Sequence, residues 1–318
     1  MLYSCFPHRE SKIFLQYYFF FLRFSAICCA CIFLYSSSPY FSTKCLRCSC
    51  FLILDLQWNF GIESFDGISQ KEIVRILGNN RFLAWLIIPF LFVALFLVIH
   101  TKFVHKRTVL SIFSGRENFD WKRVLFSFSL LFSVLSLFLF IQYLSSDSLI
   151  FQFDLQKFIP LFFIAIFLLP IQTSCEELLF RSYILQGIKM RTKKNSVAVL
   201  ISGLMFGAIH IGNPEIAKIG YHIIVYYMLV GVFLALISLF DNGIELALGY
   251  HAANNVFAAL MITNNWQAFR TNALFVDLSK PQFGWDSILT IVLVQPLILV
   301  LFSKLFGWKN WRSTLFSK

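Results

Sequence analysis

The segment Phe82–Thr101 reads FLAWLIIPFLFVALFLVIHT and contains no Asp, Glu, Lys or Arg. A helix rises about 1.5 Å per residue, so a run of this length can cross the roughly 30 Å hydrocarbon core of a bilayer. Backbone groups in lipid must be satisfied within the chain, and an apolar run this long indicates a helix rather than a barrel strand. The segment therefore predicts a membrane-spanning helix.

Six further apolar segments follow along the chain. They are Val124–Tyr143, Phe158–Ile188, Val197–His210, Gly220–Phe240, Ile244–Met261 and Ser287–Phe302. We expect the long Phe158–Ile188 segment to be broken at Pro170, because proline removes a helical hydrogen bond. The pattern predicts an all-α, polytopic transmembrane helical bundle with about seven core spans.

The overall composition supports this fold class. The chain has 318 residues, of which 58% are hydrophobic and 14% charged. Soluble domains carry about 25% charged residues, so this chain lacks the polar surface to face water on all sides. The net charge of +11 could indicate a nucleic-acid partner, but the basic residues lie at the ends of apolar runs. We therefore expect the bilayer as partner and no nucleic acid.

The basic residues also predict the orientation of the spans. If seven spans alternate across the bilayer, fourteen Lys and Arg residues lie on one side, and four lie in the loops of the other. The fourteen are Lys102, Lys106, Arg107, Arg116, Lys122, Arg123, Lys189, Arg191, Lys193, Lys194, Lys304, Lys309, Arg312 and Lys318. Three more basic residues precede the first span on the second side, among acidic neighbours. The positive-inside rule makes the first side cytoplasmic.

Residues 1–58 differ in character from the rest and hold seven of the eight cysteines. We interpret them as a Cys/Phe-rich N-terminal extension and residues 59–318 as the membrane domain. The next methionine after Met1 is Met190, so an internal start does not explain the difference. One hypothesis is that part of 1–58 is upstream sequence read from a misassigned start; a real additional helix is the alternative.

Three charged residues lie together inside an apolar segment: Glu176, Glu177 and Arg181. Each such group costs about 2.5–3.5 kcal/mol at the centre of a bilayer helix. Helical spacing puts Glu177 and Arg181 one turn apart as an ion pair, and Glu176 points about 100° away. One interpretation is a buried ion pair that only fixes helix packing. The additional Glu176 favours a functional role instead.

Two other apolar segments carry histidines. His210 follows Phe206 by four residues, beside Gly203 and Gly207, whose small size lets another helix approach. Alone, His210 is more often an interfacial residue than a catalyst.

His251 and Asn255 lie one turn apart on a third segment, with Gly249 as a small packing residue. They could simply bond a neighbouring helix. Three segments that each bring polar groups suited to hydrolysis favour a shared site. We expect Glu245, near the start of the same segment, at an aqueous edge.

These residues form three motifs: EExxxR (Glu176 to Arg181), FxxxH (Phe206 to His210) and HxxxN (His251 to Asn255). Their order and setting resemble the CPBP family of intramembrane proteases, which includes CAAX prenyl endopeptidases and ABI-like, bacteriocin-processing members. The resemblance covers roughly residues 80–305. It implies an endopeptidase acting on a membrane-associated or lipidated protein or peptide, with a site opening toward the cytoplasm.

The resemblance also implies roles for the motif residues. Glu176 is the candidate general base, because a partly desolvated carboxylate accepts a proton more readily near neutral pH. His210 would share the attacking water, and His251 and Asn255 would stabilise the oxyanion. Glu177 and Arg181 would support this assembly. A zinc ion held by Glu176, His210 and His251 is a second version, and we favour the metal-free one slightly.

Two other functions remain open from the sequence. A transporter or channel could use the buried Glu and His residues as a proton relay, although no repeated halves are evident. An inert, immunity-type scaffold on the same fold is the other. The Phe- and Lys-rich composition with short loops is typical of an AT-rich bacterial genome, which predicts the inner membrane of a bacterium.

Overall fold

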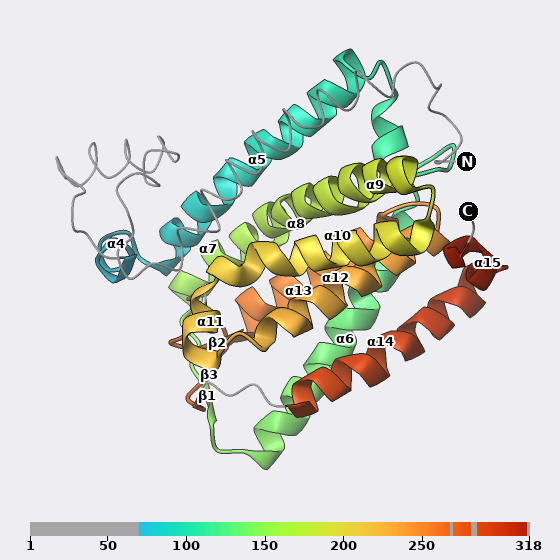
Figure 1. Cartoon of the computed structure of the whole chain (residues 1–318). Helices are drawn as coiled ribbons and strands as arrows, with labels where there is room; N and C mark the ends of the chain where they lie inside the picture. Colours follow the sequence, from blue (N-terminus) through green and yellow to red (C-terminus); the bar gives the residue numbers. More distant parts are fainter. Residues whose placement is uncertain (1–69, 268–269, 281–284, 317–318) are drawn as a thin grey trace.

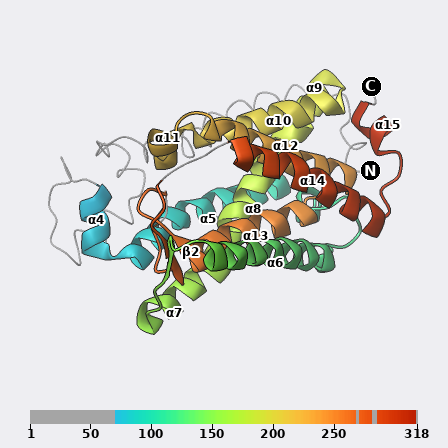
Figure 2. The same ribbon diagram turned by 90° about the horizontal axis from the view of Figure 1, so that it is seen from below.

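The computed structural model describes residues 70–267, 270–280 and 285–316. The predicted extension 1–58 lies outside these residues. The described chain is mostly helical, and the long helices pack side by side (Figures 1 and 2). The predicted all-α helical class is confirmed.

The helices follow the predicted apolar segments. In chain order they are α4 (Gln70–Leu77), α5 (Asn79–Phe103), the short 3-10 turn η1 (Val109–Ile112), α6 (Trp121–Ser145), α7 (Leu155–Phe163), η2 (Ile164–Leu168), α8 (Leu169–Glu177), η3 (Leu178–Ile184), α9 (Leu185–Thr192), α10 (Asn195–Ile209), η4 (His210–Gly212), α11 (Pro214–Ile219), α12 (Ile223–Phe240), α13 (Glu245–Met261), α14 (Trp285–Leu305) and α15 (Trp311–Phe316).

Five stretches of the described chain are long and apolar enough to cross a membrane. They are Asn79–Phe103, Trp121–Ser145, Leu155–Thr192, Asn195–Gly212 and Ile223–Phe240. The other two predicted spans are also helices, α13 and α14, but α13 has 17 residues and begins with a buried glutamate. The protein is an integral membrane protein, with a span count close to the predicted seven.

The predicted break at Pro170 is wrong. Helical structure continues without interruption from Leu155 to Thr192, through two π-helical segments, η2 and η3. Pro170 lies in the first turn of α8, directly after η2. Proline has no N–H with which to bond the carbonyl four residues before it. The π turn in front of Pro170 shifts the hydrogen-bond pattern at this point, so the helix continues past the proline.

The two ends of the bundle are built differently. At one end, β1 (Leu149–Phe151), β3 (Phe275–Asp277) and β2 (Ile262–Thr263) form a small sheet with β3 in the middle, antiparallel to β1 and parallel to β2. The helix α11 lies at the same end (Figure 1). At the opposite end are α9 and α15, next to the basic loops of the sequence.

Glycines bring the central helices close together. Gly249 of α13 lies against the backbone of Val124 and Phe128 in α6, where a Cβ atom would clash. Gly203 and Gly207 of α10 face α12 in the same way. The prediction that these small residues allow close helix approach is confirmed.

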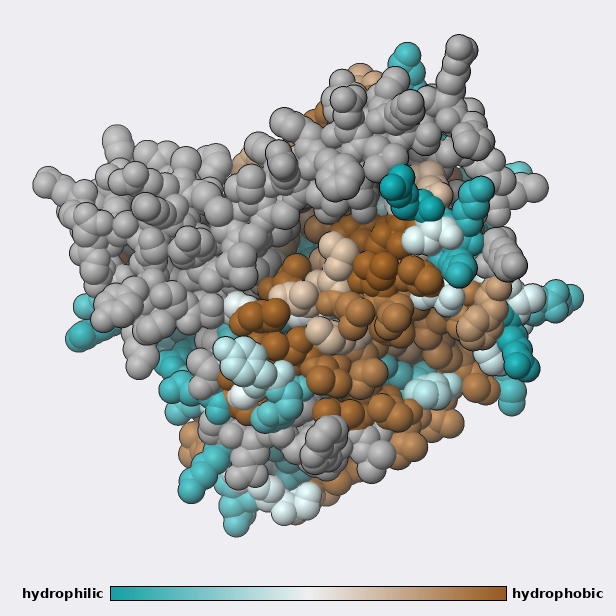
Figure 3. Space-filling view, in the orientation of Figure 1, coloured by the Kyte–Doolittle hydropathy of each residue, from teal (hydrophilic) through white to brown (hydrophobic). Residues whose placement is uncertain are grey.

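The outer surface matches a lipid environment. Long helices expose large apolar side chains, among them Leu95 on α5, Leu144 on α6 and Leu297 on α14. In the space-filling view, apolar residues gather in the middle of the visible surface, and hydrophilic residues lie toward its right-hand and lower-left margins (Figure 3). This banded distribution is what a bilayer-spanning bundle requires.

Candidate functional site

The EExxxR segment lies where α8 passes into η3, and all three charged side chains are buried. Arg181 Nε lies 3.0 Å from Glu177 Oε2, so the predicted ion pair is present. The Arg181 guanidinium also lies over the ring of Phe206, 4.5 Å from its centroid. Arg181 thereby ties the long helix to α10 while it neutralises Glu177.

The second oxygen of Glu177 reaches another helix. His251 on α13 donates its Nδ1 proton to Glu177 Oε1 across 2.7 Å. The other ring nitrogen, Nε2, lies 3.7 Å from Glu176 Oε2. A carboxylate bonded to one imidazole nitrogen fixes the tautomer and the ring direction. The hydrogen bond to Glu177 therefore directs Nε2 of His251 toward Glu176.

Glu176 has a different set of neighbours from Glu177. The Gln172 amide, one turn earlier on α8, donates to Glu176 Oε1. Asn255 of α13 donates its own amide to Gln172 Oε1 at 3.0 Å. The chain of contacts therefore runs from Asn255 through Gln172 to Glu176. The 3.7 Å between Glu176 Oε2 and His251 Nε2 is longer than a direct hydrogen bond, and a water beside the two atoms can bond to both.

His210 enters the same region from the end of α10. Its Nδ1–H donates to the Phe206 carbonyl at 2.7 Å, which leaves Nε2 as the acceptor nitrogen of the neutral ring. The ring stacks on Tyr227 of α12, with centroids 4.2 Å apart. Phe206 contacts both histidine rings, at 4.8 Å from His210 and 5.7 Å from His251. The FxxxH motif therefore packs one aromatic ring between the two imidazoles.

These side chains border one cavity of about 710 Å³. Glu176, His210, His251 and Asn255 line it, together with Phe206, whereas Glu177 and Arg181 lie behind the wall. The structure therefore brings the three predicted motifs to a single place. Apolar side chains of α6 and α14 form another wall, made by Leu131, Val134, Leu135, Phe138, Ile291 and Val294.

The predicted zinc ligands do not fit a metal in this arrangement. In the described part of the chain, no three His, Cys, Asp or Glu side chains converge at a distance suited to a metal ion. We therefore derive no step through zinc.

Two polar residues near the motifs were missed by the sequence reasoning. Gln172 precedes Glu176 by one helical turn, so the spacing of an amide in an apolar helix was an available signal. Glu215 on α11 lines the cavity and is 9% exposed. Nothing in its local sequence indicates burial, because α11 is short and follows an irregular turn.

The polar margin of the cavity lies at one end of the bundle, and the prediction that the site opens toward the cytoplasm stays a prediction. The cavity lining includes Asn213, Glu215 and Gln267, which belong to the end of the bundle that holds the small sheet. None of the described lining residues belongs to the loops with the fourteen basic residues.

A family model matches the segment of the chain that contains the three motifs. Residues 155–257, which contain all three motifs, match the model of the family described as type II CAAX prenyl endopeptidase Rce1-like. This is a protease family, and the resemblance predicted from the motifs is confirmed over that segment.

One relative is described only as the uncharacterized protein YyaK of Bacillus subtilis (strain 168). It is 30% identical over 192 residues, which are 60% of this chain and 64% of the relative, less than two thirds of its length. No solved structure matches the chain.

Proposed function

We propose that this protein is an intramembrane endopeptidase of the CAAX-protease and bacteriocin-processing type, which hydrolyses peptide bonds with a water activated by Glu176. The observation that carries the proposal is the arrangement of Glu176 between Gln172 and His251 on the wall of a large cavity. An ionisable group held this way inside a membrane protein has a high energetic cost, which a catalytic role explains.

The chemistry follows from the contacts of Glu176. A water between Glu176 Oε2 and His251 Nε2 attacks the carbonyl carbon of the substrate, and its proton passes to Glu176. When the carbon–nitrogen bond breaks, Glu176 returns that proton to the leaving amine. Gln172 holds the other Glu176 oxygen and keeps the carboxylate directed at the water.

The two histidines and Asn255 have supporting roles. His210 Nε2 accepts a hydrogen bond from the attacking water, because its Nδ1–H is occupied by the Phe206 carbonyl. His251 and Asn255 share one face of α13. Asn255 donates its second amide hydrogen to the oxyanion as it forms, and His251, as the imidazolium beside Glu177, donates from Nε2. Glu177 and Arg181 position His251 without touching the substrate. Of the two versions that the sequence leaves open, the proposal takes the metal-free mechanism.

The apolar wall of the cavity bears on the substrate. Side chains from α6 and α14 lie opposite the catalytic groups, and lipid or a transmembrane segment suits such a surface. We therefore propose a membrane-associated or lipidated protein or peptide as the substrate. The relative in Bacillus subtilis supports a bacterial cytoplasmic membrane as the location.

The test is cleavage of membrane-embedded and prenylated reporter peptides by the purified protein in detergent or liposomes. We expect cleavage by the wild type and by the exposed-carboxylate control Glu117→Ala, and loss of cleavage by Glu176→Ala and His210→Ala. Equal cleavage by all four proteins would contradict the peptidase assignment. Cleavage that disappears on exhaustive chelation and returns with zinc would contradict the metal-free mechanism alone.

A further inference from the structure

The helix α12 carries none of the three motifs, yet one of its side chains lies against a motif residue. The Tyr227 ring stacks on the ring of His210, with centroids 4.2 Å apart and an angle of 17° between the ring planes. Both residues line the cavity. Tyr227 therefore contacts a proposed catalytic group, although the proposed mechanism gives it no role.

His210 lies where the backbone gives a side chain little support. It follows the last residue of α10 and begins η4, a single 3-10 turn, whose hydrogen-bond geometry is poorer than that of an α-helix. Within its own segment, the ring is held by the Phe206 carbonyl at Nδ1 and by the tilted Phe206 ring. A hydrogen bond fixes one atom of the imidazole, whereas a near-parallel stack restrains its whole plane. That restraint comes from Tyr227.

The packing of α10 on α12 sets the distance between the two rings. Gly207 is three residues before His210, and it lies against Met228 of α12. A Cβ atom at position 207 would lie 2.8 Å from the Met228 nitrogen, so a larger residue would push the helices apart. Because Met228 is next to Tyr227 in the chain, the close approach at Gly207 brings Tyr227 within stacking distance of His210.

The position of Tyr227 is itself fixed by neighbours. The Asn213 side chain forms a hydrogen bond with Tyr227, and the Tyr226 ring contacts the Tyr227 ring edge-on, with centroids 5.6 Å apart. Asn213 belongs to the same turn as His210, because its backbone N–H donates to the His210 carbonyl at 2.9 Å. Tyr227 therefore contacts both ends of the segment 210–213.

We propose that Tyr227 is a positioning residue for the peptidase reaction, and that its ring holds the His210 imidazole in the plane that directs Nε2 at the attacking water. This proposal rests on the proposed function, which supplies the water and the role of His210. Tyr227 acts through His210 and is not itself a catalytic residue. A rotated imidazole would carry its acceptor nitrogen away from the water, and a misplacement of about 1 Å can cost about 100-fold in rate.

Reporter cleavage by the purified full chain tests this role. Tyr227→Leu removes the stacked ring, so we expect kcat to fall about tenfold or more with KM within about twofold of wild type. Tyr227→Met also lacks a ring but fills the space with a flexible side chain, and it should give the same split. Tyr227→Phe keeps the ring, so its kcat should stay within about threefold of wild type. Tyr221→Leu, at a position that is 74% exposed, is the matched control and should cleave as the wild type does.

A second measurement does not depend on cleavage. The ring protons of the six histidines can be observed by NMR after isotope labelling, and the His210 signal is the one that His210→Gln removes. A proton over the face of an aromatic ring is shifted upfield. Tyr227→Leu and Tyr227→Met should therefore move the His210 signal downfield, whereas Tyr227→Phe and Tyr221→Leu should leave it close to its wild-type position. Thermal unfolding of each variant identifies any that has lost the fold.

The results that would overturn the proposal are distinct from those that bear on the peptidase function. A folded Tyr227→Leu or Tyr227→Met that keeps the wild-type kcat would overturn it, as would a Tyr227→Phe that is as impaired as Tyr227→Leu. A His210 signal that does not move when the ring is removed would contradict the stack itself. If the signals move as expected but the wild type cleaves no peptide, the peptidase function fails and the stacking of Tyr227 on His210 stands.

Discussion

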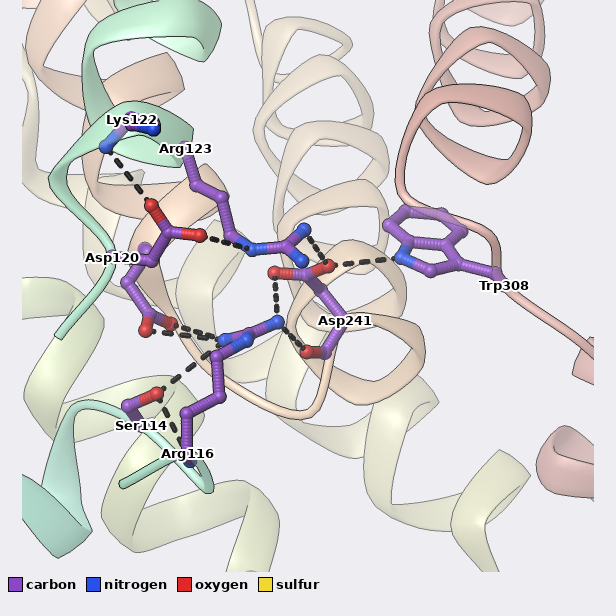
Figure 4. A network of polar contacts seen from close by, with 8 residues as sticks. Ser114, Arg116, Asp120, Lys122, Arg123, Asp241 and Trp308 are labelled. Carbon is purple, nitrogen blue, oxygen red and sulfur yellow. Dashed lines mark hydrogen bonds and ion pairs between the residues drawn. The ribbon is translucent and has the colours of Figure 1, made fainter. Parts of the chain in front are cut away.

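Two groups of ionisable side chains are buried in this protein, and they differ in how their carboxylates are bound. The first group is an ion-pair network at the end of the bundle that holds α9, α15 and the basic loops. There Asp241 is bound by Arg116 and Arg123, each at 2.8 Å, and by Trp308 Nε1 at 2.9 Å. Arg116 also reaches Glu245 at 3.1 Å. Figure 4 shows how Asp241 lies between the two guanidinium groups and the indole.

In the cavity, the two adjacent carboxylates are treated differently. Glu177 is bound by Arg181 and His251, as the carboxylates of the ion-pair network are bound by their partners. Glu176 receives a neutral amide from Gln172 and faces an imidazole nitrogen at 3.7 Å. A fully paired buried charge holds structure together, whereas a carboxylate without a close cation keeps the ability to exchange a proton.

The largest expected effect is a loss of cleavage activity when the Glu176 carboxylate is replaced. Glu176→Gln keeps the shape and the contact with Gln172 but cannot accept a proton, so we expect cleavage to fall about 10³-fold. The thermal unfolding midpoint should stay close to that of the wild type. Reporter cleavage with parallel thermal unfolding in detergent measures both. Retained activity would place the base elsewhere.

The next effect should appear in stability. Asp241→Asn removes the charge that both arginines share, and breaking a buried ion pair costs about 3 kcal/mol. We expect a lower unfolding midpoint in denaturant and cleavage per folded molecule within about twofold of wild type. The exposed Glu117→Gln is the matched control. A stable but inactive Asp241→Asn would show that the network is part of the site.

A smaller effect tests the amide that directs Glu176. Gln172→Leu has a similar size but cannot donate to Glu176 or accept from Asn255. We expect kcat to fall about ten- to hundredfold with little change in KM, because the base loses its fixed direction. Gln156→Leu, at an exposed position on α7, is the control. An unchanged kcat would remove Gln172 from the proposed site.

The smallest expected effect is on the pH dependence of stability, through His105 in the loop after α5. Burial, with the neighbouring charges of His100 and Arg107, lowers the pKa of His105 from 6.5 to about 4. The unfolded chain then binds a proton below pH 6.5 that the folded chain does not, so stability falls as the pH drops from 6.5 toward 4. We expect His105→Gln to reduce the loss between pH 7 and pH 5 by about 1 kcal/mol, after solvent screening. Unfolding midpoints of both proteins across this range test it; identical slopes would contradict it.

The sequence predicted those parts of the fold that depend on local pattern. Apolar length located the helices, and four-residue spacing located the Glu177–Arg181 pair and the shared face of His251 and Asn255. Small residues correctly indicated where α10 and α13 meet their neighbours. Each of these features lies within one helix, where the geometry is set by neighbours in the chain.

Features that depend on distant segments were not predicted. Glu245 was expected at an aqueous edge, but it is fully buried against Arg116, a residue 129 positions away in a loop. The direction of the cavity depends on how α6, α12 and α14 pack against one another, and it cannot be predicted from any single segment. The continuity of the long helix past Pro170 likewise required a π turn whose sequence has no strong signature.

The π segment η3 follows directly after the two adjacent glutamates. A π turn takes in one residue more than an α turn, so it changes by about 100° the rotational phase between the helix before it and the helix after it. Removal of one residue from η3 would therefore turn Glu176 away from His251, or else turn the Ser182–Tyr183 side off its partners in α5 and η1. One additional residue thus sets the angle between the half of the helix that carries Glu176 and Glu177 and the half that contacts α5 and η1.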